Sequence, residues 1–554
     1  MFKLLKNSLY LLVFLSCQKN SNQQPVPIPV VNSFGFNALT VNGQFSGFDY
    51  KGIAPSPTIK ISFSASVNPT SVPGSVTLTD SGNQPVTCLF SYEHQDSSLV
   101  IQSSTPLQFL SKYQLTVSTG LKSKTGGSLQ SAVSVNLSTT IDSTNKFPVI
   151  PDEDLLTLIQ KQTFKYFWEF GHPISGMARE RNTSGEVVTT GGTGFGIMAI
   201  PVAVERKFIT RSEALTRLQT ITAFLKNKAG HYHGAFSHWM NGTSGAVVPF
   251  GDKDNGADIV ETSYLMMGLL TARQYFSGPD GIETALRSDI DTLWNQVEWD
   301  WFRKDGGNML YWNWSPDYGF AVNVPVQGWN ECLITYVLAA SSPKHAIPKV
   351  VYDNGFARNG AIKNNNSFYG YLLPLGPALG GPLFFEHYSF LGINPNGLTD
   401  AYANYNIQTV NHSKINYEYC VANPNHYFGY SKDCWGLTAS DIQGGYTAGS
   451  PTNDGSVIAP TAAISSLPFT PAESLRALHF FYYKLGDKIW GPYGFNDAFS
   501  LENRWFASST LAIDQGPQIV MIENYRTGLV WNLLMSCPEI KTGMKGLGFQ
   551  SKNL

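Results

Sequence analysis

The chain has few charged residues, few cysteines and none of the common zinc-binding motifs. Charged side chains make up 14% of its 554 residues and the net charge is −2, so nothing in the charge balance favours a nucleic acid or an anionic membrane surface as partner. No Cys-x-x-Cys or His-Glu-x-x-His pattern occurs, and we therefore expect no metal site and no cofactor. No repeat of fixed length indicates a solenoid.

Tryptophan is missing from the first 150 residues, and all twelve tryptophans lie at or beyond Trp168. The early part shows short alternating stretches bounded by Gly, Pro, Asn or Ser, which is typical of a small β-sandwich. From residue 153 onward, apolar residues recur at the i, i+3, i+4 spacing of helices, and long loops separate them. We expect a mainly α protein with a β-sandwich at 34–142, a linker at 143–152 and a toroid of helical hairpins at 153–554. The alternating stretches are TIKISFS, SVTLTD, SLVIQS, YQLTVST and VSVNLST.

The apolar stretch near the N-terminus is too short to span a bilayer permanently. Lys3 and Lys6 precede it, and Leu-Ser-Cys ending at Cys17 follows it. This pattern resembles a bacterial lipobox, which predicts a signal peptide at 1–16, a lipid on Cys17 and a tether at 17–33. The protein would then be anchored in the envelope of a Gram-negative bacterium, in the periplasm or at the outer membrane, touching the membrane only through that lipid. The alternative is an ordinary secretory signal with a chance cysteine.

The remaining cysteines number five, so at least one stays unpaired if Cys17 is lipidated. Cys420 and Cys434 flank a tyrosine-rich loop. In an oxidising compartment we expect these two to form a disulfide.

Three carboxylates stand just ahead of a long apolar helical run. Asp254, Asp258 and Glu261 fall at i, i+4 and i+7, a spacing that places them on one face of a helix and its entry loop. Asp258 with Glu261 is also close to a capping box, so a purely structural role for this pair stays open. Asp254 lies a full turn earlier and is harder to explain as a cap.

Further acids stand among glycine and aromatic residues later in the chain. Glu331 follows Gly-Trp-Asn at a predicted helix start, where an acid also favours the helix dipole. Asp497 lies in a Trp- and Gly-rich segment, and Asp514 in Ile-Asp-Gln-Gly-Pro, which predicts an acid presented from a loop.

Carboxylates set among indole rings suit the cleavage of a glycosidic bond, in which one acid protonates the leaving oxygen and one base activates water. Flat aromatic rings would hold the faces of the sugars. The histidines lack metal-ligand spacing, and a structural role for them stays as plausible as binding. The candidate substrate-binding residues are His238, Trp239, Trp329, His387, Tyr388, Trp435 and Tyr525.

Several motifs resemble the bacterial glycoamylase-like domain, and more specifically its β-1,2-glucanase family, over about residues 153–549. They include DNGADIVETSYLMMGLLTARQYF, QGWNECLITYVLAASSP, GPLFFEHYSFLG, CWGLTASD and AIDQGPQIVMIENYRTGLVW. The resemblance implies an (α/α)6 toroid that hydrolyses β-1,2-glucan with inversion of the anomeric configuration. It implies Glu331 as the acid and Asp514 as the base, with Asp497 as the alternative base. The remaining acids, Asp254, Asp258 and Glu261, would line the cleft.

Residues 34–142 resemble a bacterial immunoglobulin-like module, and we favour a spacer role for it over carbohydrate binding because it has few exposed aromatic candidates. We expect a monomer whose partner is an oligo- or polysaccharide. Two other hypotheses stay open. One is an α-glucan exo-hydrolase of glucoamylase type, since fold does not determine linkage. The other is a non-catalytic glycan-binding lipoprotein.

Overall fold

The computed structural model describes residues 33–554, which fall into two compact units that divide between Thr140 and Ile141. Cys17 and the predicted tether up to residue 32 lie outside the described residues. No helix among residues 33–554 is both long enough and apolar enough to cross a membrane.

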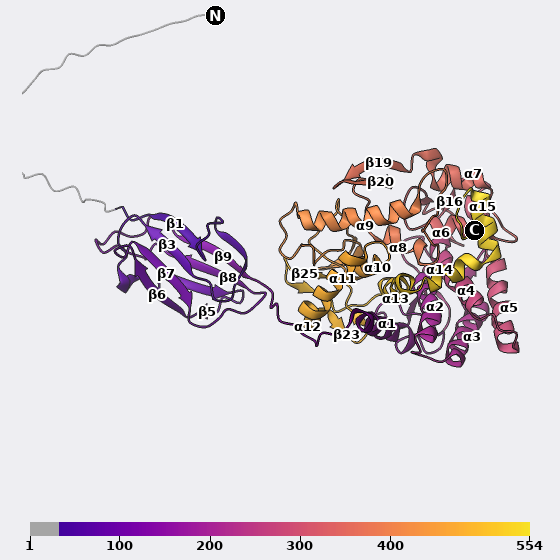
Figure 1. Ribbon diagram of the computed structural model, residues 1–554, viewed down its shortest axis with the longest axis horizontal. Coiled ribbons are helices and arrows are strands. Elements are labelled where there is room, and N and C mark those ends of the chain that lie inside the picture. The colour runs from indigo at the N-terminus through magenta and orange to yellow at the C-terminus, as the bar shows by residue number, and fades with distance from the viewer. Residues whose placement is uncertain (1–32) are drawn as a thin grey trace, which may run out of the picture. The chain divides into compact units, whose positions relative to one another are not determined.

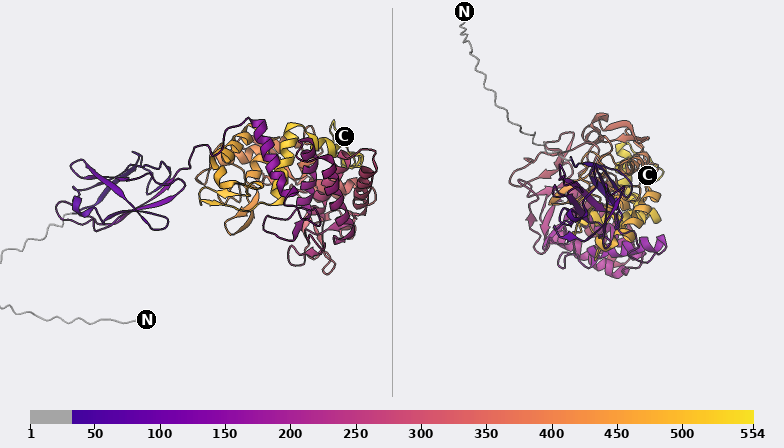
Figure 2. Two further views of the ribbon diagram at one scale, coloured as in Figure 1. Left: turned by 90° about the horizontal axis from the view of Figure 1, so that it is seen from below. Right: turned by 90° about the vertical axis from the view of Figure 1, so that its left-hand side faces the viewer.

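The first unit is a sandwich of two β-sheets (Figures 1 and 2). One sheet has the strand order β1-β3-β7-β6 and the other β2-β9-β8-β4-β5, and all pairs are antiparallel except β2 with β9. Inward side chains alternate with exposed ones along β3 and β9, as a half-buried strand requires. The predicted alternating stretches therefore form strands. The bounds are β1 (Phe36–Val41), β2 (Asp49–Ile53), β3 (Ile59–Phe63), β4 (Val76–Asp80), β5 (Pro85–Val86), β6 (Cys88–Glu93), β7 (Ser98–Ser103), β8 (Lys112–Val117) and β9 (Val133–Thr139).

The second unit is mainly helical, and its helices are joined by long loops that contain short strands (Figure 1). The helices are α1 (Asp152–Trp168), α2 (Thr190–Glu205), α3 (Arg211–Asn227), α4 (Ile259–Tyr275), α5 (Gly281–Gln296), α6 (Leu333–Ser341), α7 (Lys349–Val351), α8 (Phe384–His387), α9 (Tyr405–Ala422), α10 (Pro460–Ser465), α11 (Pro471–His479), α12 (Leu485–Ile489), α13 (Ala512–Arg526), α14 (Leu529–Ser536) and α15 (Pro538–Leu547).

The short strands pair locally. One three-stranded sheet has the order β10 (Val187–Thr189), β13 (Trp239–Asn241) and β14 (Val247–Val248). The two-stranded pairs are β11 (His231–Tyr232) with β12 (Ala235–Phe236), β15 (Ala257–Asp258) with β17 (Asn313–Trp314), β16 (Leu310–Tyr311) with β18 (Pro325–Val326), β19 (Lys363–Phe368) with β20 (Tyr371–Leu375), β21 (Ala439–Ile442) with β22 (Gly445–Ala448), β23 (Trp490–Gly491) with β24 (Gly494–Phe495), and β25 (Phe499–Ser500) with β26 (Trp505–Phe506).

Helix α2 packs against both α4 and α13 in the helical unit. Fourteen of its sixteen residues are buried, which explains why it shows no amphipathic period. Glycines permit the close approach: a Cβ on Gly194 would lie 2.2 Å from the carbonyl oxygen of Tyr264, and one on Gly268 would lie 2.3 Å from the carbonyl oxygen of Gly194. The N-terminal ends of α2 and α4 are thereby held side by side.

Candidate active site

Asp258 combines the two roles that the sequence left open. It is the N-cap of α4, where its Oδ1 accepts hydrogen bonds from the backbone N–H groups of Val260 (3.0 Å) and Glu261 (2.9 Å). Its Oδ2 lies 2.9 Å from His238 Nδ1. The capping bonds therefore fix the carboxylate in place while leaving one oxygen to the histidine.

Glu261 stands between the N-terminal ends of two helices. Its Oε2 accepts a hydrogen bond from the backbone N–H of Gly191, at the start of α2, over 2.7 Å. Its Oε1 lies 4.0 Å from His238 Nε2. A Cβ on Gly191 would be 2.6 Å from Oε2, so only glycine allows this approach. Burial raises the pKa of Glu261 above its usual range, although the charge of His238 opposes the shift.

His238 is a cation within this acidic group. Burial alone would lower the pKa of its imidazole, but the charges of Glu261 and Asp258 outweigh that effect and raise the pKa to about 9. The ring is therefore protonated at neutral pH. It offsets part of the negative charge gathered at the start of α4.

Asp254 joins the same group from the preceding loop. Its Oδ2 accepts a hydrogen bond of 3.1 Å from Asn313 Nδ2, on the strand that pairs with Ala257 and Asp258. Burial, together with the charge of Asp258, raises the pKa of Asp254 to about 6.

Glu331 faces these carboxylates from another part of the chain. It precedes α6, and the turn is held by Asn330 Oδ1, which accepts from the backbone N–H of Cys332 over 3.0 Å. Burial raises the pKa of Glu331 to about 7, and the charges of Glu261 and Asp258 add to the shift. The structure thus brings Glu331 together with the acids of α4, about 70 residues earlier.

Asp497 and Asp514 form a second acidic group. In its acid form, Asp514 donates a hydrogen bond to Asp497, whose Oδ2 also accepts from the backbone N–H of Asp441 over 2.6 Å. Asp497 Oδ1 and Asp514 Oδ2 are buried without any other partner among the described residues. The two carboxyl groups therefore satisfy each other only while one of them carries a proton.

The electrostatics of this pair agree with its geometry. Burial raises the pKa of Asp497 to about 7, and burial with the charge of Asp497 holds the pKa of Asp514 well above its usual range. Asp441 lies beside the pair, where it accepts from Arg181 Nη1 (3.2 Å) and Ser509 Oγ (2.5 Å). One proton shared between two carboxyls leaves the pair with a single negative charge near neutral pH.

Two tyrosines lie within electrostatic reach of these acids. The phenol of Tyr388 is buried, and its pKa is raised by that burial and by the charges of Asp514, Glu331 and Glu261. It is therefore close to both groups. Tyr264 is close to Glu331 and Glu261, and its hydroxyl is buried with no hydrogen-bond partner among residues 33–554.

Aromatic rings line the outer side of His238. Phe250 stacks on the imidazole with ring centroids 4.0 Å apart, and Trp239 stands edge-on to both rings. Phe250 is half-exposed and sits in the same tight turn as Asp254. Phe250 and Trp239 are both at least partly exposed, so they are candidates for contact with a bound sugar.

Four predicted binding residues do not fit direct contact with a sugar. Trp329 and Trp435 are buried, and their indole nitrogens donate to Glu386 Oε1 and to the carbonyl of Glu473. His387 is buried against Ser466 Oγ; burial and the charge of His412 lower its pKa to about 3. Tyr525 lies at the opposite end of α13 from Asp514, about 16 Å away at the rise of a helix. Burial argues against sugar contact for Trp329, Trp435 and His387, since neighbours of glycine and acid residues also fill cores, and the distance from Asp514 argues against it for Tyr525.

Two further predictions need correction. Asp514 stands in the first turn of α13 and not in a loop, and Pro517 lies inside that helix. The predicted disulfide is not formed: Cys420 and Cys434 are both buried free thiols. Cys420 belongs to α9, and its sulfur accepts a hydrogen bond from the backbone of Gly436, so both act as small apolar side chains.

Several residues of the site were missed from the sequence. Asp441, Arg181 and Tyr264 are among them, as is Phe250. Asp441 lies inside the CWGLTASD motif, and an acid in a Gly- and Trp-containing motif was a usable signal. Tyr446 was also missed; it is half-exposed on β22 and within electrostatic reach of Asp514 and Asp497.

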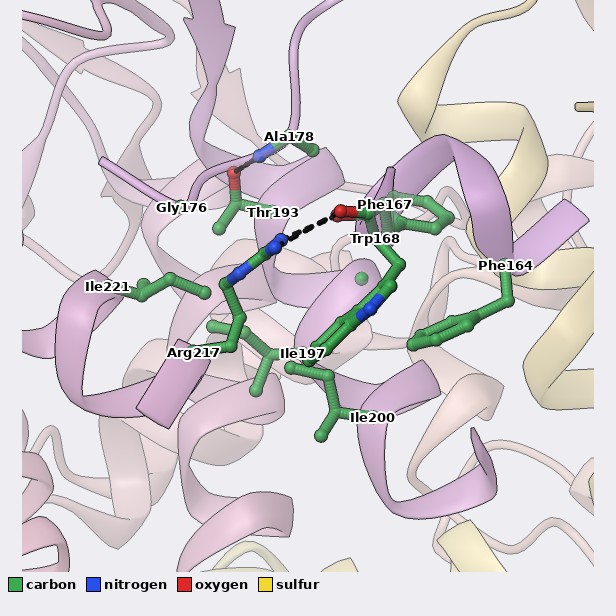
Figure 3. A pocket seen from close by; sticks show the side chains of 11 residues that line it. Phe164, Phe167, Trp168, Gly176, Ala178, Thr193, Ile197, Ile200, Arg217 and Ile221 are labelled. Atoms are coloured by element: carbon green, nitrogen blue, oxygen red, sulfur yellow. Dashed lines mark hydrogen bonds between the residues drawn. The ribbon is translucent and has the colours of Figure 1, made fainter. Parts of the chain in front are cut away.

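A separate cavity lies between α1, α2 and α3 (Figure 3). Its wall is mainly apolar, and Arg217 closes one side by donating to the carbonyls of Phe167 and Trp168 while stacking on the Trp168 ring. It has room for about one water molecule. No acid lines it, so it belongs to the packing of the helices.

Comparison with known proteins agrees with both units. The family model described as "Putative glucoamylase" matches residues 323–538, and the one described as "Bacterial Ig-like domain" matches 37–140. A curated protein of Parabacteroides distasonis, an exo β-1,2-glucooligosaccharide sophorohydrolase acting at the non-reducing end, is 46% identical over 417 residues. That alignment covers 71% of this chain but only 58% of the Parabacteroides protein.

Solved structures give the same result over more of their length. The endo-β-1,2-glucanase of Chitinophaga pinensis, solved with sophorotriose and glucose, is 50% identical, with 73% of this chain and all of that chain covered and a TM-score of 0.72. A β-1,2-glucanase of Parabacteroides distasonis is 37% identical, with 95% and 74% covered and a TM-score of 0.70. An endo-β-1,2-glucanase of Talaromyces funiculosus, 10% identical with a TM-score of 0.54, shares the fold alone. With 50% identity over the whole Chitinophaga chain, this protein belongs to the bacterial glycoamylase-like family of β-1,2-glucanases and carries an N-terminal bacterial Ig-like domain.

Proposed function

We propose that the protein hydrolyses β-1,2-glucan by an anomer-inverting acid/base mechanism. The observation that carries this proposal is that Glu331 with the α4 acids and the Asp497–Asp514 pair both lie within electrostatic reach of the buried phenol of Tyr388. The relatives named above act on β-1,2-linked glucans, which identifies the linkage.

Glu331 is the proposed general acid. Its pKa of about 7 keeps a large share of the carboxyl protonated at neutral pH, and a general acid works best with a pKa near the working pH. Burial is the main cause of the raised pKa, and the charges of Glu261 and Asp258 add to it by disfavouring another negative charge. In the reaction Glu331 gives its proton to the oxygen between two glucose units as the bond breaks.

The Asp497–Asp514 pair is the proposed base. Because the two carboxyls share one proton, one of them is ionised and accepts the proton of the attacking water, while the other stays an acid and stabilises it by a hydrogen bond. Inversion requires acid and base to stand about 6.5–9.5 Å apart so that water fits between base and sugar.

The proposal extends to the architecture. We propose an (α/α)6 toroid in which α2, α4, α6 and α13 are inner helices that begin at the cleft. Asp258, Glu261, Glu331 and Asp514 all lie at or beside the first turns of these helices, where the positive end of the helix dipole supports acidic side chains. The substrate then reaches the acids from the loop side.

We also propose that a lipid on Cys17 holds the protein in the envelope of a Gram-negative bacterium, as a monomer. The anchor rests on the lipobox-like pattern of Lys3 and Lys6, a short apolar stretch and Leu-Ser-Cys. Cell fractionation tests it: the wild-type protein should be found with membranes, and a Cys17→Ala variant should not. Equal membrane association of both would contradict the anchor.

Product chromatography on a panel of β-1,2-glucan, laminarin and starch tests the proposed activity. We expect released sugar from β-1,2-glucan only, and a Glu331→Gln variant slower by about 10³-fold with an unchanged substrate KM. Glucose from starch would support a glucoamylase activity instead, and tight binding without release would support a non-catalytic glycan-binding protein. A time course separates internal cleavage, which gives mixed lengths early, from release of disaccharide.

A further inference from the structure

A short segment of the chain holds the backbone on both sides of Glu331. Ser389 Oγ donates to the Glu331 carbonyl over 2.5 Å and accepts from the Ile334 backbone N–H over 3.0 Å. Three residues earlier, Glu386 Oε1 accepts from Trp329 Nε1 over 2.8 Å. The turn from Trp329 to Ile334 is therefore attached to α8 and the residues after it at both of its ends.

Glu386 is the most deeply buried carboxylate in this arrangement, with no exposed surface. Its Oε1 accepts three hydrogen bonds, from Trp329 Nε1 (2.8 Å), Gln408 Nε2 (2.8 Å) and His412 Nδ1 (2.7 Å). An oxygen that faces three donors belongs to an ionised carboxylate.

His412 supplies the countercharge. Its Nδ1 faces Glu386, and its Nε2 lies 3.0 Å from the carbonyl oxygen of Gly381. Both partners are acceptors, so each ring nitrogen must donate, and the ring is an imidazolium. A Cβ on Gly381's neighbour Gly380 would come within 2.0 Å of this ring, which shows how tightly the ring is enclosed.

A gain in stability does not by itself explain this buried ion pair. Removing two charges from water costs several kcal/mol per ion, and well-packed apolar residues often serve as well. In addition, Glu386 Oε2 is buried with no hydrogen-bond partner among the described residues. What the pair provides that apolar residues do not is a fixed direction for the indole N–H of Trp329, two residues from Glu331.

We propose that Glu386, paired with His412, is a positioning residue that orients the general acid Glu331 through the indole of Trp329. This inference rests on the proposed function of Glu331. Glu386 itself does not touch the reacting atoms. Its loss should therefore disturb the transfer of the proton more than the binding of the glucan.

Steady-state kinetics of Glu386→Met and Trp329→Phe on β-1,2-glucan test the proposal. Both variants break the same hydrogen bond: Glu386→Met keeps nearly the same volume, and Trp329→Phe keeps an aromatic ring of smaller size. We expect kcat to fall about 10- to 100-fold with KM within about twofold, as for a group displaced by about 1 Å. Glu386→Gln keeps a carbonyl oxygen for the three donors and should recover most of the loss. The double variant Glu386→Met/Trp329→Phe should be no slower than the slower single variant.

Glu523→Met is the matched control. Glu523 is equally buried and ion-paired, with Arg206 at 2.8 Å, but it lies near the far end of α13. We expect the Glu523→Met variant to have a lower Tm than the wild type. At temperatures where it is folded, its kcat should equal that of the wild type. If Glu386→Met does not fold, Trp329→Phe carries the test, because Glu386 and His412 stay intact in it.

Normal kcat in folded Glu386→Met or in Trp329→Phe would overturn the proposal, and so would additive losses in the double variant. A crystal structure of Trp329→Phe gives a readout that does not depend on activity: the Glu331 carboxyl should be displaced, and an unmoved carboxyl would also overturn the proposal. If wild-type protein released no sugar from β-1,2-glucan, the proposed function would fail, and this crystallographic result would still decide the role of Glu386.

Discussion

Glu331, Asp497 and Asp514 all have pKa values raised towards or beyond neutrality, and burial is the first cause in each case. Each carboxyl also lies beside other acids, which adds to the effect. His238 is the opposite case, since its acidic neighbours keep it protonated. The site therefore holds both protonated and ionised carboxyl groups at the same pH, as acid/base cleavage of a glycoside requires.

The pH dependence of kcat/KM should be a narrow bell centred near pH 7. Glu331 must hold its proton, which it loses as the pH rises through about 7, while the Asp497–Asp514 pair must have lost one, which it regains as the pH falls below about 7. In Glu331→Gln the residual rate should keep the acidic limb and lose the alkaline one. A flat profile from pH 5 to 9 would be inconsistent with these assignments.

Stability should reveal the same raised pKa. The pKa of Glu331 is about 7 in the folded protein, and its ordinary value is 4.5. As the pH rises from 4.5 to 7, the unfolded chain loses this proton while the folded protein keeps it. The free energy of unfolding therefore decreases over this range. The cost reaches at most about 3 kcal/mol and is reduced because the side chain is only half-buried. Glu331→Gln should therefore raise Tm at pH 8 and leave it unchanged at pH 4.

Glu523→Gln provides the control of opposite sign. Burial opposes ionisation of Glu523, but Arg206 and its other hydrogen-bond partners outweigh burial and lower the pKa. This carboxylate therefore contributes stability above about pH 4.5, and its replacement should lower Tm at pH 8. Equal shifts of Tm in both variants would show that the ionised side chain of half-buried Glu331 does not destabilise the folded protein at pH 8.

At the scale of elements, the contact between α2 and α4 determines where Glu261 lies. Gly194→Ala places a methyl group 2.2 Å from the Tyr264 carbonyl, so the helices must separate. We expect a loss of about 2–4 kcal/mol of stability and reduced activity, because Glu261 would move away from Gly191. Thermal unfolding and glucan hydrolysis measure the two effects.

Gly546→Ala is the matched substitution, since it lies in α15 and a methyl group there meets nothing within 4 Å. It should leave activity unchanged and stabilise the helix by about 0.5–1 kcal/mol. If Gly194→Ala were as stable and active as Gly546→Ala, the close approach of α2 and α4 would not be what holds the site.

Most helices were predictable from the apolar spacing of the sequence, but some of the buried ones were not. The spacing identified α1, α3 and α5, and also α4 and α6, which are buried on nearly all sides. By contrast, α2 is buried almost all round and rich in glycine, and α13 carries Pro517, so neither shows the expected pattern. Likewise the apolar spacing does not predict α9, because several of its buried side chains are polar and make hydrogen bonds that only the tertiary structure supplies.

The candidate acids were predictable because each stood in an unusual setting of glycine and aromatic residues, and the structure gathers all six into two neighbouring groups. The aromatic partners were less predictable. Trp329 and Phe250 look alike in sequence, yet one ring is buried and the other is half-exposed. Exposure depends on the packing of distant loops, which local sequence does not contain.

For the whole molecule, all the proposed catalytic residues lie in the unit from Ile141 to Leu554. A protein comprising residues 141–554 should therefore fold and hydrolyse β-1,2-glucan with kcat/KM unchanged within about twofold, because each unit has its own core. Kinetics on soluble glucan measure this. A large rise in KM on truncation would instead assign glucan binding to the Ig-like unit, contrary to the spacer role.

The central claim is that Glu331 and the Asp497–Asp514 pair act on opposite sides of a β-1,2-glucosidic bond with a water between base and sugar. Proton NMR of the first products released from β-1,2-glucan tests it most directly, since the anomeric signal reports both the broken linkage and the face attacked by water. We predict that the α-anomer of the new reducing end appears first and then mutarotates. Initial release of the β-anomer, or the absence of any new reducing end, would contradict the account.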